Sequence, residues 1–252
     1  MNHMVIESNL SSLEIIEDTA IITISNGKKN LLSNPEFIDK YVLEHALQDN
    51  PQVNSLIITG AGRHFSHGAD VSRFNEPFGS PAYEENEKAL HRAKELLLYI
   101  ENLPIITVAA INGGCFGGGF EVALSCQFRI CSKSAFLGLP EINHGVIPGM
   151  NGIERLTKAV GKAKAISMIL SGEIISAADA KKLKLVSFVS DKKNCMSEAI
   201  AFVKALKNGK TDLQIRSIIT LVNKTANGDP IDLEDTSFID VLNNKLEMSV
   251  DE

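Results

Sequence analysis

The first part of the chain alternates short apolar runs with polar turns, and this pattern predicts strands. Residues 13–16 and 20–24 flank a polar turn at Glu17-Asp18-Thr19 and predict a hairpin. The run 55–59 predicts a third strand, which ends at Gly60. The run 105–111 is apolar without alternation, as expected of a strand that is buried on both faces. Two short strands are expected at 128–131 and 135–137.

Helical spacing of apolar residues appears between these strands and dominates the rest of the chain. Ser33 with Pro35 predicts a helix that runs to about Leu47, and Ser80-Pro81 predicts a second helix that Pro104 ends. A short helix is expected from about Gly118 to Ser125. Further helices are predicted at 152–160, 162–170, 177–183, 195–206, 212–227 and 233–248. Strands with helical crossovers followed by a helical tail indicate an α/β core with appended helices.

Composition narrows the possible classes of function. The net charge of −6 and the pI of about 5.6 disfavour a nucleic-acid partner, which would require a basic surface. No apolar run approaches the roughly 18 residues of a membrane span, and the first ten residues do not resemble a signal peptide. Cys115, Cys126, Cys131 and Cys195 form no C-x-x-C pair, so no metal site is expected. Scattered cysteines of this kind indicate a reducing compartment, and we expect a cytoplasmic protein.

Two stretches combine a backbone bend with one glutamate each. Residues 112–121 contain a run of glycines and end in Glu121, and residues 139–149 contain Pro140-Glu141 and Pro148-Gly149. A glutamate beside uncovered backbone N–H groups is a candidate acid or base. Each could instead be structural: Glu121 as a helix-start carboxylate, and Glu141 as a surface-loop carboxylate.

A third stretch, residues 60–71, could complete such a site. It follows a buried strand and contains Gly68-Ala69. If the N–H of Ala69 converged with that of Gly118 on one oxygen, the two would form an oxyanion hole, although each loop alone could be an ordinary turn. The glycines match neither a dinucleotide fingerprint nor a phosphate-binding P-loop, and nothing in the sequence pairs Cys115 with a histidine.

Together the three stretches resemble the crotonase superfamily, the enoyl-CoA hydratase/isomerase proteins. The family patterns F-x-x-G-A-D, N-G-x-x-x-G-G-G-x-E and P-E-x-x-x-G-[IV]-x-P-G match Phe65–Asp70, Asn112–Glu121 and Pro140–Gly149 in order and spacing. With Ser176–Ala180 and Leu185-Val186 downstream, the resemblance covers roughly residues 12 to 248.

The resemblance implies a fold and a division of the chain. The fold would be an α/β spiral of ββα units, formed by residues 1–190 with the active site, and residues 191–252 would form a helical oligomerisation region. It implies a homo-oligomer, either a trimer or a dimer of trimers.

The resemblance also implies chemistry on an acyl thioester, carried by CoA or by an acyl carrier protein, with no cofactor other than the CoA of the substrate. The thioester oxygen would lie between the N–H groups of Ala69 and Gly118. Glu121 would orient and deprotonate a water, and Glu141 would exchange a proton at the α-carbon. Further substrate contacts are expected from Ser66, His67, Gly68, Asp70, Gly117, Gly149 and Met150, and phosphate contacts from Arg63 and Arg73.

The presence of both glutamates favours hydration of a 2-enoyl thioester. Isomerisation of its double bond, or other enolate chemistry, is the alternative within enzymes, and a crotonase-like assembly protein is the alternative outside them. The sequence departs from the family at Met150-Asn151, where small residues are common, and at His144, where a hydrocarbon side chain is commoner.

Overall fold

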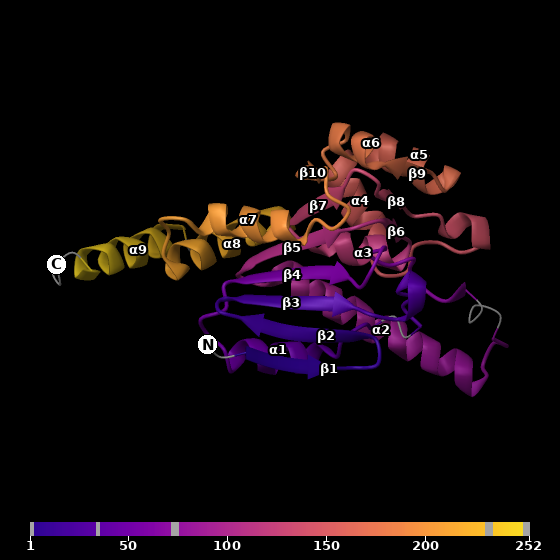
Figure 1. Ribbon diagram of the computed structural model, residues 1–252, viewed down its shortest axis with the longest axis horizontal. Helices are drawn as coiled ribbons and strands as arrows, with labels where there is room; N and C mark the ends of the chain where they lie inside the picture. The colour runs from indigo at the N-terminus through magenta and orange to yellow at the C-terminus, as the bar shows by residue number, and fades with distance from the viewer. Residues whose placement is uncertain (1–2, 34–35, 72–75, 230–233, 249–252) are drawn as a thin grey trace.

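The computed structural model describes residues 3–33, 36–71, 76–229 and 234–248, and two sheets form its centre (Figure 1). The larger sheet has seven strands in the order β1-β2-β3-β4-β5-β7-β10. Their bounds are β1 His3–Glu7, β2 Ser11–Ile16, β3 Thr19–Ile24, β4 Ser55–Gly60, β5 Ile106–Ile111, β7 Phe128–Ser132 and β10 Phe188–Ser190. The smaller sheet has the order β6-β8-β9, with β6 Gly114–Phe116, β8 Phe136–Gly138 and β9 Ile174–Ser176.

In the large sheet β2 runs opposite to the other six strands. The hairpin of β2 and β3 is antiparallel, with Leu13 opposite Ile22, and β1 continues it antiparallel. From β3 through β4, β5, β7 and β10 all pairs are parallel. Because parallel strands end at the same edge, the loops that follow β4 and β5 emerge side by side. The loop after β4 contains Ala69, and the segment after β5 leads through β6 to Gly118.

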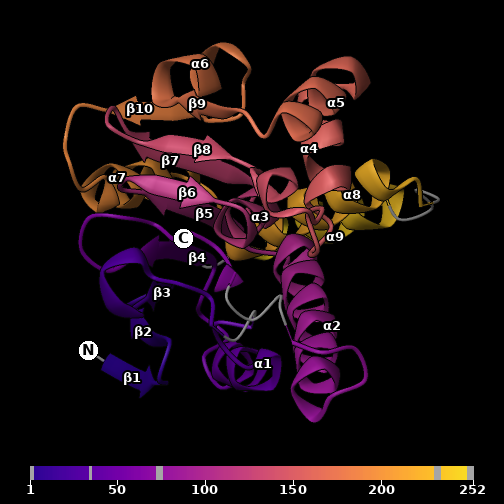
Figure 2. The same cartoon turned by 90° about the vertical axis from the view of Figure 1, so that its right-hand side faces the viewer.

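Helices surround the sheets and fill the intervals between strands. The α-helices are α1 Lys40–Gln48, α2 Pro81–Asn102, α3 Gly118–Ser125, α4 Gly152–Val160, α5 Lys162–Ser171, α6 Ala177–Lys182, α7 Met196–Lys207, α8 Asp212–Asn227 and α9 Glu234–Met248, and the short 3-10 helices are η1 Gly27–Lys29 and η3 Glu141–His144. Helix α3 packs against β6, α4 and α2 (Figure 2). All eight residues of α3 are buried, so Gly118 and Glu121 lie on a rigid element.

The apolar core lies on both faces of the large sheet. Every residue of β5 is buried; Ala109 and Ile111 join the main cluster, whereas Val108 and Ala110 join a second cluster behind the sheet. This is the alternation that a pleated strand imposes. Helix α7 closes the second cluster with Ala199 and Val203. The continuous apolar pattern of 105–111 is therefore explained by burial on both faces.

All four cysteines are free and buried. Cys115, Cys126 and Cys131 lie in the main cluster, and Cys195 lies in the second. Burial raises the pKa of Cys126, Cys131 and Cys195 to about 12, and that of Cys115 well above its ordinary value. Cys115 therefore packs as a small apolar residue.

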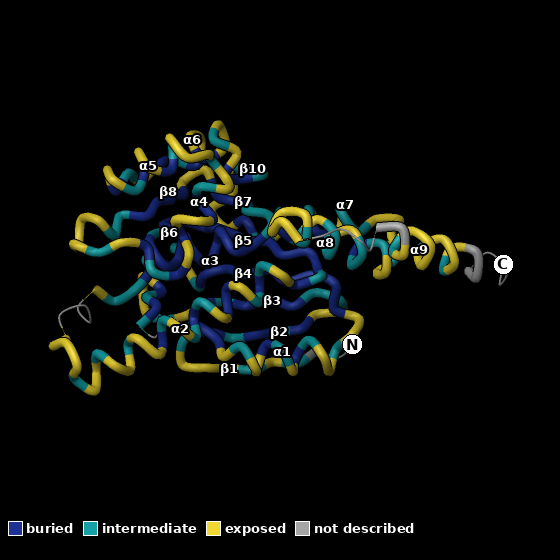
Figure 3. Tube along the Cα trace, turned by 180° about the vertical axis from the view of Figure 1, so that it is seen from behind, coloured by how far each residue is buried: buried dark blue, intermediate teal, exposed yellow. Residues whose placement is uncertain are grey.

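Helices α8 and α9 extend away from the sheets at one end of the molecule (Figures 1 and 3). Among the described side chains of these two helices, Ile215 is buried, and the large apolar residues that stay exposed are Leu213, Ile218, Val222, Phe238, Ile239 and Leu242. No helix within the described ranges is both long enough and apolar enough to cross a membrane.

The α/β fold class predicted from the sequence is confirmed, and one helix boundary was wrong. The first helix begins at Lys40 and not near Ser33, because Asp39 accepts the N–H groups of Tyr41 and Val42. Ser33 instead accepts a hydrogen bond from Asn26 at 3.1 Å. Phe37 is buried in the loop before the helix. Pro35 lies outside the described residues.

Candidate active site

The loops after β4 and β5 meet at Gly68 and Gly118. The φ angle of Gly68 is +81°, and a Cβ there would lie 2.6 Å from the Phe116 carbonyl oxygen and 2.9 Å from the Gly118 nitrogen. The Ala69 nitrogen lies 3.8 Å from the position that a Gly118 Cβ would take. Gly118 is the first residue of α3, so its N–H has no partner within the helix. The two N–H groups predicted to bind one oxygen are therefore brought together.

Glu121 lies in the first turn of α3 and is only 2% exposed. Its Oε1 accepts the N–H of Met150 at 2.7 Å and the N–H of Gly152 at 2.8 Å. Burial raises the pKa of Glu121, while these two hydrogen bonds and the charges of Arg155 and Lys94 oppose the rise. A Cβ on Gly152 would lie 2.7 Å from Oε1, so the backbone can approach Glu121 this closely only with a glycine at position 152.

Glu141 begins η3, just after β8, and its environment differs from that of Glu121. Both of its carboxylate oxygens are buried, and neither has a hydrogen-bond partner in the described structure. Burial, together with the nearby charge of Glu121, raises its pKa to about 7, against an opposing backbone hydrogen bond. A Cβ on Gly117 would lie 3.2 Å from Oε1 of Glu141, so this carboxyl group faces the residue before Gly118.

Apolar side chains cover the space beside the two N–H groups. A Cβ on Gly118 would lie 2.8 Å from Cε of Met150 and 3.4 Å from Cδ1 of Leu32, and both side chains are buried. Gly149 faces Leu90 of α2, whose Cδ1 would lie 3.3 Å from an added Cβ. Gly149 and Met150 therefore lie at the site, as predicted, and the Met150 side chain reduces the space in front of Gly118.

The other predicted contact residues lie on the Gly68 loop and have different partners. Ser66 is buried and donates to the Asn30 carbonyl at 2.7 Å, so it supports the loop. The His67 ring lies 4.9 Å from the Phe116 ring, and its Nε2 is buried without a described partner. Burial first, then the charges of His64 and Lys29, lower the pKa of His67. Asp70 is partly exposed and follows Ala69.

Of the two arginines predicted to contact phosphate, the structure describes one. Arg63 is exposed, at the outer side of the same loop, while Arg73 lies outside the described residues. Lys29 is a cation that sequence reasoning missed: its carbonyl accepts the N–H of His67 at 3.0 Å, and its charge acts on His64 and His67. No motif singled it out, because a lysine after a turn glycine usually serves only as surface charge.

Asn30 and Arg155 were also missed. Asn30 has a positive φ of 50°, and its side chain donates to the carbonyls of Ala61 and His64, which ties the loop after β4 to the segment before Leu32. An asparagine among turn residues was the available signal. Arg155 is buried in α4, and nothing in the sequence distinguished it from a surface arginine. His144, in contrast, is exposed beside Glu141.

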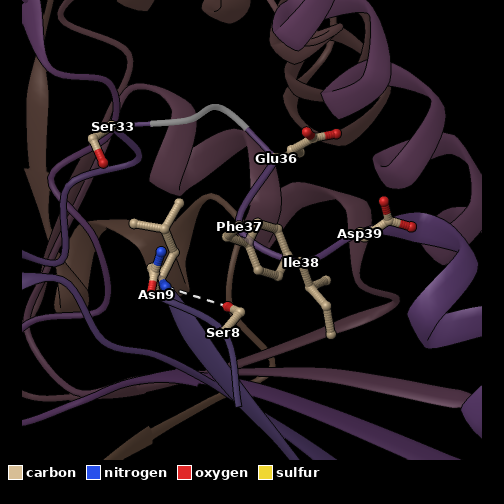
Figure 4. A pocket seen from close by; sticks show the side chains of 8 residues that line it. Ser8, Asn9, Ser33, Glu36, Phe37, Ile38 and Asp39 are labelled. Atoms are coloured by element: carbon tan, nitrogen blue, oxygen red, sulfur yellow. Dashed lines mark hydrogen bonds between the residues drawn. The ribbon is translucent and has the colours of Figure 1, made fainter. Parts of the chain in front are cut away.

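Two hollows elsewhere on the surface do not contain the predicted chemistry. One of about 430 Å³ lies between the loop before β2 and a second side formed by Ser33 and residues 36–39 (Figure 4). Its acidic side chains already have structural partners, because Glu36 binds Arg92 at 2.7 Å and Asp39 caps α1. The other, of about 810 Å³, follows one side of α2, and its lining includes Leu90, which lies beside Gly149. No group of three or more His, Cys, Asp or Glu in the described ranges is arranged to hold a metal ion.

The site thus combines two neighbouring backbone N–H groups with two carboxyl groups of different character. Such donors stabilise negative charge that develops on a carbonyl oxygen. A carboxylate held by N–H groups, next to a carboxyl group that is half protonated near neutral pH, can act as a base and an acid at the same time. The arrangement fits proton transfer next to a polarised carbonyl.

Comparison with known proteins gives this chemistry a family. The model of the enoyl-CoA hydratase/isomerase family matches residues 15–237. A "Probable enoyl-CoA hydratase" of Bacillus subtilis (strain 168) is 40% identical over 179 residues, which are 71% of this chain and 68% of that protein. DspI of Pseudomonas aeruginosa superposes with a TM-score of 0.82 at 28% identity, over 94% of this chain and 90% of that one.

A structure from Thermobifida fusca YX in complex with CoA superposes with a TM-score of 0.79, over 97% of this chain and 95% of that one; at 24% identity it supports the fold. The chain therefore belongs to the enoyl-CoA hydratase/isomerase family of the crotonase superfamily, whose enzymes process acyl-CoA thioesters.

Proposed function

We propose that the protein adds water to the double bond of a 2-enoyl-CoA thioester. The observation behind this proposal is the contrast between the two carboxyl groups at one oxyanion site. Glu121 accepts two N–H groups, which favour its ionised form, whereas Glu141 has no described partner and a pKa raised to about 7 by burial. Hydration requires one base and one acid, and isomerisation can proceed with a single carboxyl group.

In the proposed mechanism the thioester oxygen accepts the N–H groups of Ala69 and Gly118. Glu121 removes a proton from a bound water while the water oxygen forms a bond to the β-carbon. The electron pair of the double bond moves to the thioester, and the resulting enolate oxygen is stabilised by the two N–H groups. The protonated Glu141 then donates its proton to the α-carbon, and water has been added across the bond.

Isomerisation of the double bond is the second candidate. It is favoured by the fact that Oε1 of Glu121 is already engaged by two N–H groups, while both oxygens of Glu141 are free to move a proton between carbons. The same oxyanion site would serve it. We prefer hydration because isomerisation would need only Glu141 and would leave the buried Glu121 without a role in the reaction.

Mass spectrometry in D₂O with a short 2-enoyl-CoA separates the two candidates. We expect the product to gain the mass of one water. Glu121→Gln should abolish hydration but leave some α-proton exchange, and Glu141→Gln should abolish both, each loss being on the order of 10²–10⁴-fold. Glu154→Gln is the matched control, because that glutamate is exposed on α4 and pairs with Lys158. Near-normal hydration by Glu121→Gln would overturn the role given to Glu121, and a wild-type product that gains deuterium but no water would replace this proposal with isomerisation.

We further propose that CoA, rather than an acyl carrier protein, carries the acyl group. Arg63 is exposed on the loop that contains Ala69, and Lys29 of η1 is tied to the same loop because its carbonyl accepts the N–H of His67. Charge-assisted contacts to phosphate would fix the nucleotide there without touching the reacting atoms.

A further inference from the structure

Arg155 is buried next to the segment that holds Glu121. It lies in α4, and only 4% of its side chain is exposed. Its Nη1 donates to the Met150 carbonyl oxygen at 2.6 Å. Its Nε and Nη2 donate to one oxygen of Glu101, at 2.9 Å and 2.8 Å. The guanidinium thus joins the end of α2 to the residue whose N–H binds Glu121.

The segment 150–152 needs such a support. It offers two N–H groups to a single carboxylate oxygen, from Met150 and Gly152. Between them Asn151 has a positive φ of 64°, a left-handed conformation that asparagine adopts more readily than most residues with a side chain. The backbone N–H of Arg155 also donates to the Asn151 carbonyl, at 3.1 Å. Arg155 therefore binds the carbonyls of two successive residues of the segment.

The end of α2 that carries Glu101 is itself held by helix α8. Asn223 of α8 donates to its backbone carbonyl at 3.3 Å, and Asn227 donates to the neighbouring Asn102 at 3.2 Å. The carboxylate that orients Arg155 is therefore fixed on an anchored helix end rather than on a free loop.

We propose that Arg155 is a positioning residue for Glu121. By holding the Met150 carbonyl against the anchored Glu101, it keeps the N–H groups of Met150 and Gly152 directed at one oxygen of Glu121, so that the carboxylate faces the attacking water. Arg155 touches none of the reacting atoms. This inference rests on the proposed role of Glu121 in hydration.

The charges around Glu121 predict in which direction its pKa changes when Arg155 is replaced. Arg155 and Lys94 favour its carboxylate, and Glu141 disfavours it. A neutral residue in place of Arg155 removes a positive charge that favours the Glu121 carboxylate. It also weakens the two hydrogen bonds that Glu121 accepts from Met150 and Gly152, so the pKa of Glu121 rises further. Because the reaction needs the carboxylate, the acid limb of the rate profile then moves to higher pH.

Steady-state kinetics of four variants test this. Arg155→Met should lower kcat on the order of 10²-fold, as expected when a reacting group is misplaced, with little change in KM and an acid limb at higher pH. Arg155→Lys keeps the charge but not both contacts, so its acid limb should stay near that of the wild type while kcat falls. Glu101→Gln removes the negative partner of Arg155 but keeps the positive charge near Glu121, so it should not move the acid limb of the rate profile to higher pH. Lys158→Met removes a cation that is paired with Glu154 on the exposed side of the same helix, and should change neither quantity.

A measurement without turnover separates this inference from the proposed function. The carboxyl ¹³C resonance of Glu121, assigned by its loss in Glu121→Gln, should titrate at higher pH in Arg155→Met than in the wild type. That shift would support the positioning role even if the wild type failed to hydrate any thioester. An Arg155→Met protein whose resonance and kcat match those of Lys158→Met would overturn the proposal. If Arg155→Met does not fold, a wild-type kcat in Arg155→Lys would overturn it equally.

Discussion

At the scale of single residues, the two glutamates show how burial and hydrogen bonding act separately on the same chemical group. Both are withdrawn from water, and burial is the main cause that raises both pKa values. Two N–H donors from the segment 150–152 compensate Glu121, whereas Glu141 has only an opposing interaction with its own backbone. Glu141 keeps two buried oxygens without a described partner, which is a costly state for an ionised group.

This cost predicts that Glu141 destabilises the protein at alkaline pH. Its pKa is about 7 in the folded chain, against an ordinary value of 4.5. Below pH 4.5 the group is protonated in both states; as pH rises to 7 the unfolded chain ionises first, and folding stability falls. At pH 8, Glu141→Gln should therefore be more stable than the wild type by about 1–3 kcal/mol.

Thermal unfolding at pH 8 and at pH 4.5 measures this difference, because each kcal/mol moves Tm by roughly 2–4 °C in a chain of this size. The gain should disappear at the lower pH. Glu154→Gln provides the opposite sign, since Lys158 lowers the pKa of Glu154 and that exposed pair stabilises the fold slightly. A Tm difference for Glu141→Gln that is the same at both pH values would contradict the prediction.

At the scale of elements, the site depends on two loops that leave adjacent parallel strands and press against each other. β4 and β5 are paired from Ser55 with Ile106 to Thr59 with Ala110, so their carboxyl ends are level. The loop after β4 then bridges to Cys115 of β6 through Ser66. Gly68 is one of the points of close approach, because its missing Cβ lets the loop reach Gly118.

We therefore expect Gly68→Ala to separate the two oxyanion donors. Its Cβ would meet the Phe116 carbonyl and the Gly118 nitrogen at less than 3 Å, so the loop must move. Turnover should fall by about 10²-fold or more, as when an oxyanion donor is lost. Gly79→Ala is the control: its φ of +75° is similarly unfavourable for alanine, but nothing lies within 4 Å of an added Cβ. Equal turnover in the two variants would show that only backbone strain matters.

Periodicity and capping predicted the long elements. The helices α2, α4 and α8 were expected within about two residues of their observed bounds, since each combines a clear start signal with helical spacing. The strands β1, β6, β9 and β10 were missed: β6, β9 and β10 have three residues each and show no clear period, and the five residues of β1 were not recognised ahead of the hairpin, whereas the equally short β8 was expected at 135–137. The start of α1 was placed seven residues early (40 − 33), because Ser33 and Pro35 imitate a helix start while the buried Phe37 belongs to a loop.

For the site, the motifs were sufficient to bring Ala69, Gly118, Glu121 and Glu141 together in the prediction. They were insufficient for the supporting residues. Arg155 and Lys29 act through contacts with Met150 and His67 that form only when distant segments meet. A contact between distant segments produces no motif or regular spacing by which the sequence could predict it.

At the scale of the whole molecule, α8 and α9 leave a large apolar surface uncovered. Ile218 and Val222 are 58% and 59% exposed and lie one helical turn apart on α8, and Phe238 of α9 is 65% exposed. Exposed apolar surface of this extent on two neighbouring helices indicates an interaction site. We propose that copies of the same chain cover it, in keeping with the homo-oligomer that the family resemblance implies.

Light scattering then should find an oligomer at micromolar concentration, and Val222→Glu should shift it toward smaller species, because a charge cannot be buried there without a partner. Leu170→Glu is the matched control: Leu170 is 69% exposed on α5, away from α8 and α9, and should leave the assembly intact. A wild-type protein that remains a monomer, or equal dissociation by both variants, would contradict this assignment of the surface.

The buried thiols of the core have a practical consequence. In the folded protein, a thiol-directed reagent finds almost no thiolate, since burial raises the pKa of every cysteine and covers its sulfur. Labelling must therefore wait until the chain opens. Cys195 reports on the layer between α7 and the back of the sheet, and Cys115, Cys126 and Cys131 report on the front layer. Timing which sulfur is labelled first would reveal the order in which the two sides of the sheet come apart, with no engineered probe.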